Sequence, residues 1–545
     1  MNINAQFSLH NYETAVNATM DEVVQDKIVS RIWQKDHTVW QSDPAEITNR
    51  LGWLHSPETL LEQVDRIGKM VTAVRADGFT RVLLFGMGGS SLAPEMFHKI
   101  FGESCDGLPL AVVDSTDADA VRAHQESGDL RTTLFIVATK SGGTVETLSA
   151  FKYFYNQVAA LVGEADAGKQ FIAITDPGSK LVDIATQYGF RDTFINDPNI
   201  GGRYAVLSFF GIVPAALIGI DIATLLSRAA AAAADSKSAD SNYLGAKIGV
   251  IMGELAKAGR DKMTFISSPP IAPFGDWVEQ LIAESTGKNG QGILPVVGES
   301  FVVPTEYGQD RLFVYLHLAG DESHDATVAQ IKEAEHPLIV LELQDLYSLG
   351  AQFFLWEMAT AVSGYRLGIQ PFDQPNVEAA KILARKMVAQ FMETGELPEG
   401  NSAELTAENL DIFLAQAQTG DYISIHAYVP QTAVNDHALA TLRQQLLSRY
   451  NLATTVGYGP RFLHSTGQLH KGDSGNGLFI QLVSDAQQTV SIPDEAGKPD
   501  SAMSFNILKN AQALGDSEAL QAANRRIIRF HLGTDIVAGL KTLSE

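Results

Sequence analysis

Four short apolar segments, separated by longer stretches with helical periodicity, limit the folds open to the first half of this chain. They are residues 82–85, 110–113, 134–137 and 171–174. None of them alternates apolar with polar side chains, as a strand with one solvent-exposed face would. Strands that are buried on both faces and joined through helices form a parallel sheet with helices on each side. The sequence therefore predicts an α/β fold with a doubly wound, mainly parallel sheet.

A second series of apolar segments, at 263–266, 312–315 and 338–341, predicts another sheet of the same kind. A chain of 545 residues is also too long for a single hydrophobic core. We expect a helical N-terminal segment (1–76), a first α/β domain (77–235), a second α/β domain (236–400) and a smaller C-terminal α/β segment (401–545) that ends in a long helix through Arg525 and Arg526.

The charge of the chain narrows the partners it can have. It has 40 Lys and Arg residues against 64 Asp and Glu residues, and a formal net charge of -24. This excess of acidic residues argues against a nucleic acid or an anionic membrane as partner, because both bind to basic surfaces. An anionic substrate would have to be held by a few local cations and backbone dipoles.

The cysteine content and the N-terminus favour a cytoplasmic protein. Cys105 is the only cysteine, so no intrachain disulfide and no cysteine metal site is expected. Residues 1–6 show neither the basic start nor the apolar core of a signal peptide. The longest apolar stretch, 206–222, is interrupted by Pro214 and predicts a buried helix rather than a membrane span.

Two glycine-rich loops follow strands of the first predicted sheet. Residues 140–144 come after the third strand and begin a helix, where unpaired N–H groups and the helix dipole favour a phosphate. From these residues alone, a simple capping turn remains equally open. Residues 86–91 follow the first strand, at the same edge of the sheet. They do not fit the dinucleotide-binding pattern, because the glycines are too closely spaced and Pro94 interrupts the helix.

Five segments together resemble the phosphoglucose isomerase family, and they occur in the order that the family has. They are residues 88–90 (GGS), 139–144 (TKSGGT), 197–204 (DPNIGGRY), 280–288 (QLIAESTGK) and 372–381 (FDQPNVEAAK). Two more, 31–37 (RIWQKDH) and 463–472 (LHSTGQLHKG), resemble the isomerase half of fused bacterial transaldolase/phosphoglucose isomerases. A transaldolase barrel would need roughly 250 further residues, so that activity is not expected.

The resemblance implies two sugar-isomerase (SIS) type domains. It also implies interconversion of glucose 6-phosphate and fructose 6-phosphate through a cis-enediol, as in glycolysis and gluconeogenesis, without a metal or an organic cofactor. By the same analogy we expect a homodimer with active sites near the subunit boundary. The sequence does not settle whether mannose 6-phosphate is also a substrate.

The resemblance also assigns roles to residues. Glu284 matches the base that moves the proton between C2 and C1, and Arg203 matches the cation that stabilises the developing negative charge. Lys381 matches a residue that assists ring opening. Taken alone, a glutamate in this context would be a solvated helix residue. The remaining matches bind substrate: Gly89, Ser90, Thr139, Lys140, Ser141, Thr144, Gly202, Gln280 and Gln374.

One position departs from the family's pattern. The family opens the sugar ring with a histidine that follows a Gly-Gln pair, and Asp310 stands there in this chain. An aspartate is ordinarily ionised at neutral pH and cannot donate a proton as an imidazolium does. Lys381 could open the ring with a water molecule, His464 or His470 could replace the histidine, or the ring could open spontaneously. We favour a histidine, although both could instead be surface or domain-interface residues.

Other classes of function fit less well. A non-catalytic sugar-phosphate sensor would keep the phosphate loop but has no need of Glu284, Arg203, Gln374 and Lys381 together. The amidotransferase that makes glucosamine phosphate uses related domains, but it carries a glutaminase that usually begins with a cysteine. This chain begins Met1-Asn2.

Overall fold

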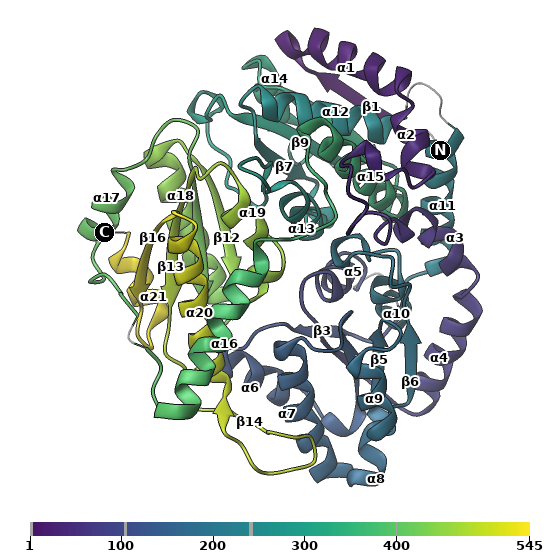
Figure 1. The fold of residues 1–545 in the computed structure, drawn as a ribbon, viewed down its shortest axis with the longest axis vertical. Helices are drawn as coiled ribbons and strands as arrows, with labels where there is room; N and C mark the ends of the chain where they lie inside the picture. The colour runs from purple at the N-terminus through teal and green to yellow at the C-terminus, as the bar shows by residue number, and fades with distance from the viewer. Residues whose placement is uncertain (1–3, 103–105, 239–242, 399, 545) are drawn as a thin grey trace.

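The computed structural model describes residues 4–102, 106–238, 243–398 and 400–544 (Figure 1). Cys105 lies outside the described residues. Three sheet-bearing units make up the molecule, and the C-terminal unit packs beside the other two (Figure 1). The mixed α/β class with mainly parallel sheets is confirmed.

The first unit is a five-stranded parallel sheet in the order β3-β2-β4-β5-β6. Every residue of β4 and β5 is buried, as the lack of polar alternation predicts. Its strands are β2 (Arg81–Phe85), β3 (Leu110–Val113), β4 (Thr133–Ala138), β5 (Phe171–Thr175) and β6 (Asp192–Ile195). Its helices are α5 (Leu92–Phe101), α6 (Ala118–Glu126), α7 (Val145–Val162), α8 (Glu164–Ala167), α9 (Lys180–Gln187) and α10 (Phe209–Ile218).

The second unit has the order β1-β10-β9-β7-β8, in which β1 runs antiparallel to β10 and the other strands are parallel. Its strands are β1 (Asn4–Ser8), β7 (Lys262–Ser267), β8 (Leu294–Val296), β9 (Arg311–Leu318) and β10 (Leu338–Leu343). Its helices are α11 (Ile222–Ser238), α12 (Leu244–Lys257), α13 (Phe274–Thr286), α14 (Asp325–Glu333) and α15 (Leu349–Leu367).

The N-terminal segment is not purely helical, because β1 belongs to the second sheet. Ala5 and Phe7, two residues apart, pack against the hydrophobic core. So short an alternation of apolar and polar residues does not identify β1 as a strand in the sequence. The strand forms because it pairs with the edge strand β10, which is a tertiary interaction. The helices that follow are α1 (Glu13–Gln25), α2 (Ile28–Trp33), α3 (Ser56–Leu61) and α4 (Val64–Ala76); α1 packs on α12, α3 on α11 and α4 on α10.

The C-terminal unit is a four-stranded parallel sheet in the order β12-β11-β13-β16. Its strands are β11 (Tyr422–Tyr428), β12 (Ala453–Tyr458), β13 (Gly477–Val483) and β16 (Arg526–His531), beside a small hairpin of β14 (Ser491–Ile492) and β15 (Met503–Ser504). Its helices are α17 (Ala407–Leu414), α18 (Ala433–Tyr450), α19 (Gly467–Gly472), α20 (Phe505–Ala522) and α21 (Ile536–Thr542). The long α16 (Val377–Thr394) precedes them and packs along α20.

The predicted helix through Arg525 and Arg526 is wrong. The helix α20 ends at Ala522, and Asn524 has a left-handed φ of 56°, which stops helical hydrogen bonding. The Arg525 guanidinium then donates to the carbonyls of Lys471 and Asp473, and Arg526 begins β16. Backbone carbonyls of another element therefore fix this turn.

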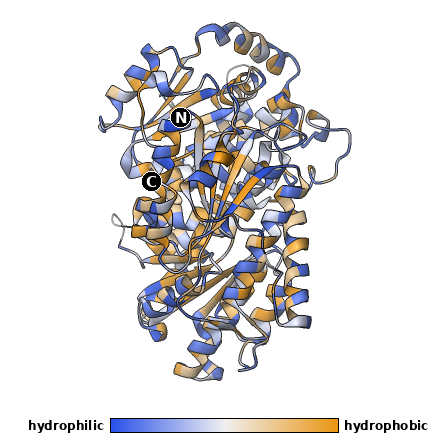
Figure 2. Cartoon of the chain, turned by 90° about the vertical axis from the view of Figure 1, so that its left-hand side faces the viewer, coloured by the Kyte–Doolittle hydropathy of each residue, from blue (hydrophilic) through white to orange (hydrophobic). Residues whose placement is uncertain are grey.

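The hydropathy of the elements agrees with their layers, since the sheet strands are largely apolar and the outer helices carry polar faces (Figure 2). The apolar stretch 206–222 forms α10, whose ten residues are all buried, so the prediction of a buried helix is confirmed. In the described residues, no helix is both long and apolar enough to cross a membrane.

Candidate active site

The glycine-rich turn after β2, a 3₁₀ helix over Gly88–Ser90, lies in backbone contact with the turn that carries Arg203. A Cβ at Gly89 would lie 1.8 Å from the carbonyl oxygen of Gly202. Only glycine permits this approach. The contact places Ser90, which is half-buried, and Gly202 beside each other at the carboxyl end of the first sheet.

The loop after β4 forms the N-terminus of α7. Thr144 is the N-cap of this helix, yet its hydroxyl lies 2.8 Å from the hydroxyl of buried Thr139 and makes no cap hydrogen bond. The first N–H groups of α7 therefore lack a side-chain cap and face the same space as Ser141. This arrangement suits a phosphate.

Lys140 points elsewhere. Its ammonium pairs with the carboxylate of Asp176 and donates to the carbonyl of Pro198 at 2.9 Å. It is not among the residues that line the cavity described below. Asp176 neutralises its charge, and Lys140 makes no direct approach to the cavity.

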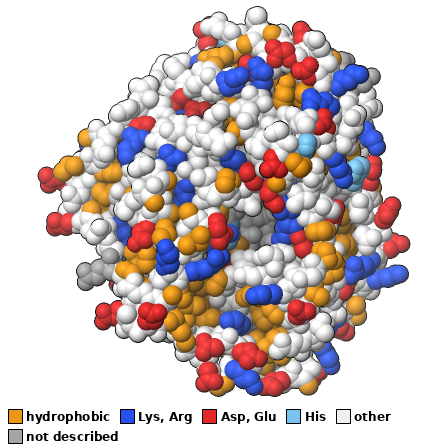
Figure 3. Space-filling view, in the orientation of Figure 1, with side chains coloured by type: hydrophobic (Ala, Val, Ile, Leu, Met, Phe, Trp, Pro, Cys, Tyr) orange, Lys and Arg blue, Asp and Glu red, His pale blue; other side chains and the backbone are white. Residues whose placement is uncertain are grey.

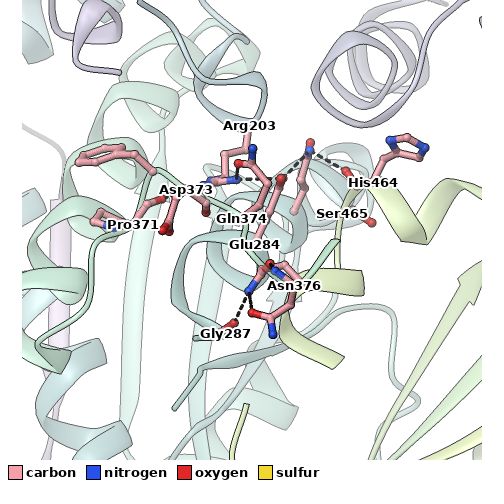
Figure 4. A network of polar contacts seen from close by, with 12 residues as sticks. Arg203, Glu284, Gly287, Pro371, Asp373, Gln374, Asn376, His464 and Ser465 are labelled. Atoms are coloured by element: carbon pink, nitrogen blue, oxygen red, sulfur yellow. Dashed lines mark hydrogen bonds and ion pairs between the residues drawn. The ribbon is translucent and has the colours of Figure 1, made fainter. Parts of the chain in front are cut away.

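Glu284 lies on α13, which begins after β7, and its side chain points toward Arg203 (Figure 4). Gln280, four residues earlier, lies on the same face of the helix. One carboxylate oxygen of Glu284 lies 2.8 Å from the Arg203 guanidinium, and the other accepts from the Gln280 amide at 3.0 Å. Gln280 also donates to the backbone carbonyl of His464 at 2.9 Å. The predicted base, its glutamine and the predicted cation are thus in direct contact.

Arg203 is buried and connects Glu284 to the segment before α16. It donates to the side chain of Gln374 at 3.2 Å and to the carbonyls of Pro371 and Asp373 at 3.0 and 2.8 Å (Figure 4). The same segment is held by Lys288, whose ammonium contacts the Asp373 carboxylate at 2.7 Å and the Gln370 carbonyl at 2.8 Å. Burial first, and then the charge of Arg203, lower the pKa of Lys288 to about 7.

A cavity of about 580 Å³ lies between the phosphate loop, α16, α20 and the segment before α19. In the view of Figure 3 the surface is hollowed near its centre, with charged side chains of both signs around the hollow. Of the predicted residues, the cavity is lined by Ser141, Thr144, Lys381 and His464. Its other polar lining includes Glu146, Glu378, Arg385 and Gln512, and Val377, Leu463, Met503 and Leu508 are among its apolar lining.

His464 faces the cavity with its ring and the Glu284 network with its backbone. Figure 4 shows the ring turned away from Glu284. Its Nε2 lies 3.0 Å from the buried carboxylate of Glu146, which also accepts from the Gln512 amide at 2.7 Å. Burial opposes the charge of Glu146, but the positive charges of His464 and Lys381 outweigh it, so the pKa of Glu146 lies below its ordinary value.

The structure does not bring His470 to the cavity. Its ring is buried among those of His426, Phe462 and Phe479, with centroids 4.7 to 5.9 Å away. Burial, and then the charges of neighbouring groups, lower the pKa of His470 well below its ordinary value. A neutral histidine in this core has no path to a substrate in the cavity.

Asp310 is also distant from these groups. It precedes β9, at the amino end of the second sheet, whereas α13 follows the carboxyl end of β7. Its carboxylate lies 3.8 Å from the ammonium of Lys262 at the same amino end. The position of the family's histidine is therefore not part of the site that this chain builds around Glu284.

Several polar residues of the site received no role from the sequence. Glu146 reads as an ordinary acidic residue in the first turn of a helix, where the dipole favours it, and this masks its contact with His464. Gln468 and Lys288 stand in recognised segments and Gln512 stands in none, and nothing in their spacing reveals their partners. In the described residues, no group of three or more His, Cys, Asp or Glu side chains is arranged to hold a metal ion.

Comparison with known proteins identifies the family of this chain. The model of the family described as phosphoglucose isomerase matches residues 14–288. A glucose-6-phosphate isomerase of Mycoplasmopsis pulmonis is 30% identical over 382 residues, covering 61% of this chain and 88% of the relative. Another, of Streptococcus agalactiae, is 27% identical over 412 residues, covering 66% of this chain and 90% of the relative.

Two solved structures share the fold. A hypothetical protein of Thermus thermophilus matches with a TM-score of 0.61 at 23% identity, covering 71% of this chain and all of that one. A glucose-6-phosphate isomerase of Chlamydia trachomatis matches with a TM-score of 0.56 at 20% identity, covering 76% of this chain and 92% of that one. With the family model matching half of its length, the chain belongs to the phosphoglucose isomerase family.

Proposed function

We propose that this protein is a glucose-6-phosphate isomerase, which interconverts glucose 6-phosphate and fructose 6-phosphate. The single observation that carries this proposal is the contact of Glu284 with both Arg203 and Gln280, next to a cavity that ends in a phosphate loop. Glu284 and Arg203 do not line this cavity themselves, and Gln280 connects them to it through the backbone carbonyl of His464. A carboxylate held by a guanidinium beside a phosphate site suits proton transfer on a sugar phosphate. Family membership supports the same reaction.

In this proposal the phosphate binds to the free N–H groups of α7 and the hydroxyls of Ser141 and Thr144. The ring then opens when one proton reaches the ring oxygen and the C1 hydroxyl gives up a proton to water. His464 delivers the first proton, because its ring faces the cavity and its Nε2 lies 3.0 Å from the Glu146 carboxylate, which orients it. Lys381, across the same cavity, adds a positive charge near the ring oxygen.

Isomerisation follows on the open chain. Glu284 removes the proton from C2, the C2–H electron pair forms the C1–C2 double bond, and the C1 carbonyl oxygen takes up a proton to give the cis-enediol. Arg203 stabilises the negative charge that develops on oxygen. Glu284 then returns its proton to C1 while the C2 hydroxyl loses one, which gives the ketose. Gln280 donates to the Glu284 carboxylate and Gln374 accepts from the Arg203 guanidinium, and these hydrogen bonds fix the positions of the two groups.

A coupled assay from fructose 6-phosphate to glucose 6-phosphate tests this proposal. Glu284→Gln should lower kcat by at least about 100-fold, the usual scale for a general base. The matched control is Glu279→Gln on the same helix. Burial raises the pKa of Glu279 to about 8, so its side chain is mostly neutral at pH 7 and the amide resembles it. An inactive wild-type protein, or equal turnover of both variants, would contradict the proposal.

The assembly rests on the family resemblance alone, and the compartment rests on the low cysteine content. We include in the proposal a homodimer that works in the cytoplasm. Light scattering of the purified protein would measure its mass against the 58.9 kDa of one chain. The same assay with mannose 6-phosphate would show whether that sugar is a further substrate.

A further inference from the structure

The side chain of Gln468 joins three segments of the site by hydrogen bonds. It is fully buried in α19. Its amide nitrogen donates to the Gly287 carbonyl at 2.9 Å and to the Asn376 side-chain oxygen at 2.7 Å. Its amide oxygen accepts from the Asn376 backbone N–H at 2.9 Å. Both donors and the acceptor of this amide are therefore used inside the protein.

Each partner belongs to an element that carries a proposed catalytic group. Gly287 directly follows α13 and lies three residues after Glu284. Asn376 directly precedes α16, which carries Lys381. Gln468 itself follows His464 by four residues. One side chain thus connects the proton-transfer group on α13 with the ring-opening groups on α16 and before α19, as the bonds at Gly287 and Asn376 show in Figure 4.

The backbone of α19 around Gln468 is closely packed against the backbone at the end of α13. A Cβ at Gly287 would lie 2.2 Å from the Cα of Leu469, and a Cβ at Gly472 would lie 2.2 Å from the Gly287 carbonyl oxygen. The end of α13 and the helix α19 therefore touch through their main chains. In contrast, the segment before α16 meets α19 through side-chain hydrogen bonds of Gln468, and its backbone before Asn376 is held by Arg203 and Lys288.

We propose that Gln468 is a positioning residue, which fixes the ring-opening half of the site, Lys381 and His464, against the proton-transfer half at Glu284. This inference rests on the proposed isomerase function. An apolar side chain of similar size would leave the Asn376 amide and the Gly287 carbonyl without partners, so the start of α16 would shift. A displacement of about 1 Å in a catalytic group can cost about 100-fold in rate.

The role can be measured by separating ring opening from proton transfer. Interconversion of the α and β anomers of glucose 6-phosphate requires ring opening and closure but no transfer at C2. In a Glu284→Gln background, the rate of anomer exchange by NMR therefore reports ring opening alone. Adding Gln468→Leu to this background should lower the enzyme-catalysed anomer exchange by about 10- to 100-fold.

Gln170→Leu in the same background is the matched control. Gln170 is also buried and donates to two backbone carbonyls, those of Leu130 and Thr133, but it lies in the first unit just before β5. It should destabilise the protein to a similar degree and leave the anomer exchange of the folded fraction unchanged. Thermal unfolding of both variants shows whether their stabilities are comparable.

A second variant covers the case in which Gln468→Leu does not fold. Asn376→Ala removes only the 2.7 Å contact and should give a smaller loss of anomer exchange in the same background. Anomer exchange at the parent rate in folded Gln468→Leu or Asn376→Ala, or an equal loss in Gln170→Leu, would overturn the positioning role. An absence of isomerase activity in the wild-type protein would instead overturn the proposed function.

Discussion

The first two units and the C-terminal unit contribute to the site in different ways. The first two units supply the phosphate loop, Arg203 and Glu284 from segments that are recognisable in the sequence. The C-terminal unit supplies His464, Gln468 and Gln512 from segments beyond the region that the family model matches. In the proposed mechanism, proton transfer thus rests on residues within the region that the family model matches, and ring opening on residues beyond it.

Within the C-terminal unit, some residues line the cavity and others only build the core. His464 and His470 lie six residues apart, yet one lines the cavity and the other lies in an aromatic core. The adjacent Lys471 pairs with fully buried Asp516 at 2.6 Å, which ties α19 to α20. Since α20 also carries Gln512, the buried cluster around His470 supports the position of the groups that face the cavity.

Substitution of the two histidines should give the largest difference in turnover between a residue that lines the cavity and one that lies in the core. His464→Ala should lower turnover of cyclic glucose 6-phosphate by about 100-fold, because a general acid is lost. His470→Phe keeps an aromatic ring in the core and should retain turnover within about 3-fold, since volume-conserving swaps are tolerated best. The coupled assay measures both. Equal losses in the two variants would break the proposed division between cavity and core.

The sequence could predict the fold because its signals are local, since strands buried on both faces are unbroken apolar runs. The proposed proton-transfer groups follow instead from the family resemblance, because the spacing of Gln280 and Glu284 on one helix would not by itself single them out. The contacts of His464, Gln468 and Glu146 join residues more than 90 positions apart, so no spacing reveals them. The same reason explains β1, whose partner β10 lies over 300 residues away.

A second test concerns the buried charge beside Arg203. Burial, and then Arg203, lower the pKa of Lys288 to about 7, below the 10.5 of a free lysine. At a pH between these two pKa values, Lys288 holds a proton in the unfolded chain but not in the folded chain. Lys288 therefore makes the free energy of unfolding rise with pH. Lys288→Met removes that dependence. From pH 7 to pH 9, the difference in unfolding free energy between the wild type and Lys288→Met should increase in favour of the wild type by up to about 1.4 kcal/mol per pH unit.

Urea denaturation at several pH values measures this difference. Lys262→Met provides a comparison, because Lys262 is also buried and ion-paired, with Asp261 at 2.7 Å, but lies at the amino end of the sheet. Parallel pH profiles of wild type and Lys288→Met would show that Lys288 keeps its proton throughout. In that case the segment from Gln370 to Asp373 would be held by a permanent ion pair.

The smallest expected effect lies in the phosphate loop. Ser141 lines the cavity, and in the proposed complex its hydroxyl donates to the phosphate. Ser141→Ala removes one hydrogen bond to a charged group, about 1.5 kcal/mol, which should raise KM by about 10-fold with kcat nearly unchanged. The phosphate binds alike before and after proton transfer, so this loss is uniform. Ser179→Ala is the control, because that hydroxyl pairs with Thr175 behind the loop. A fall in kcat rather than a rise in KM would mean that the phosphate loop takes part in the chemical step, as proposed for His464 of the C-terminal unit.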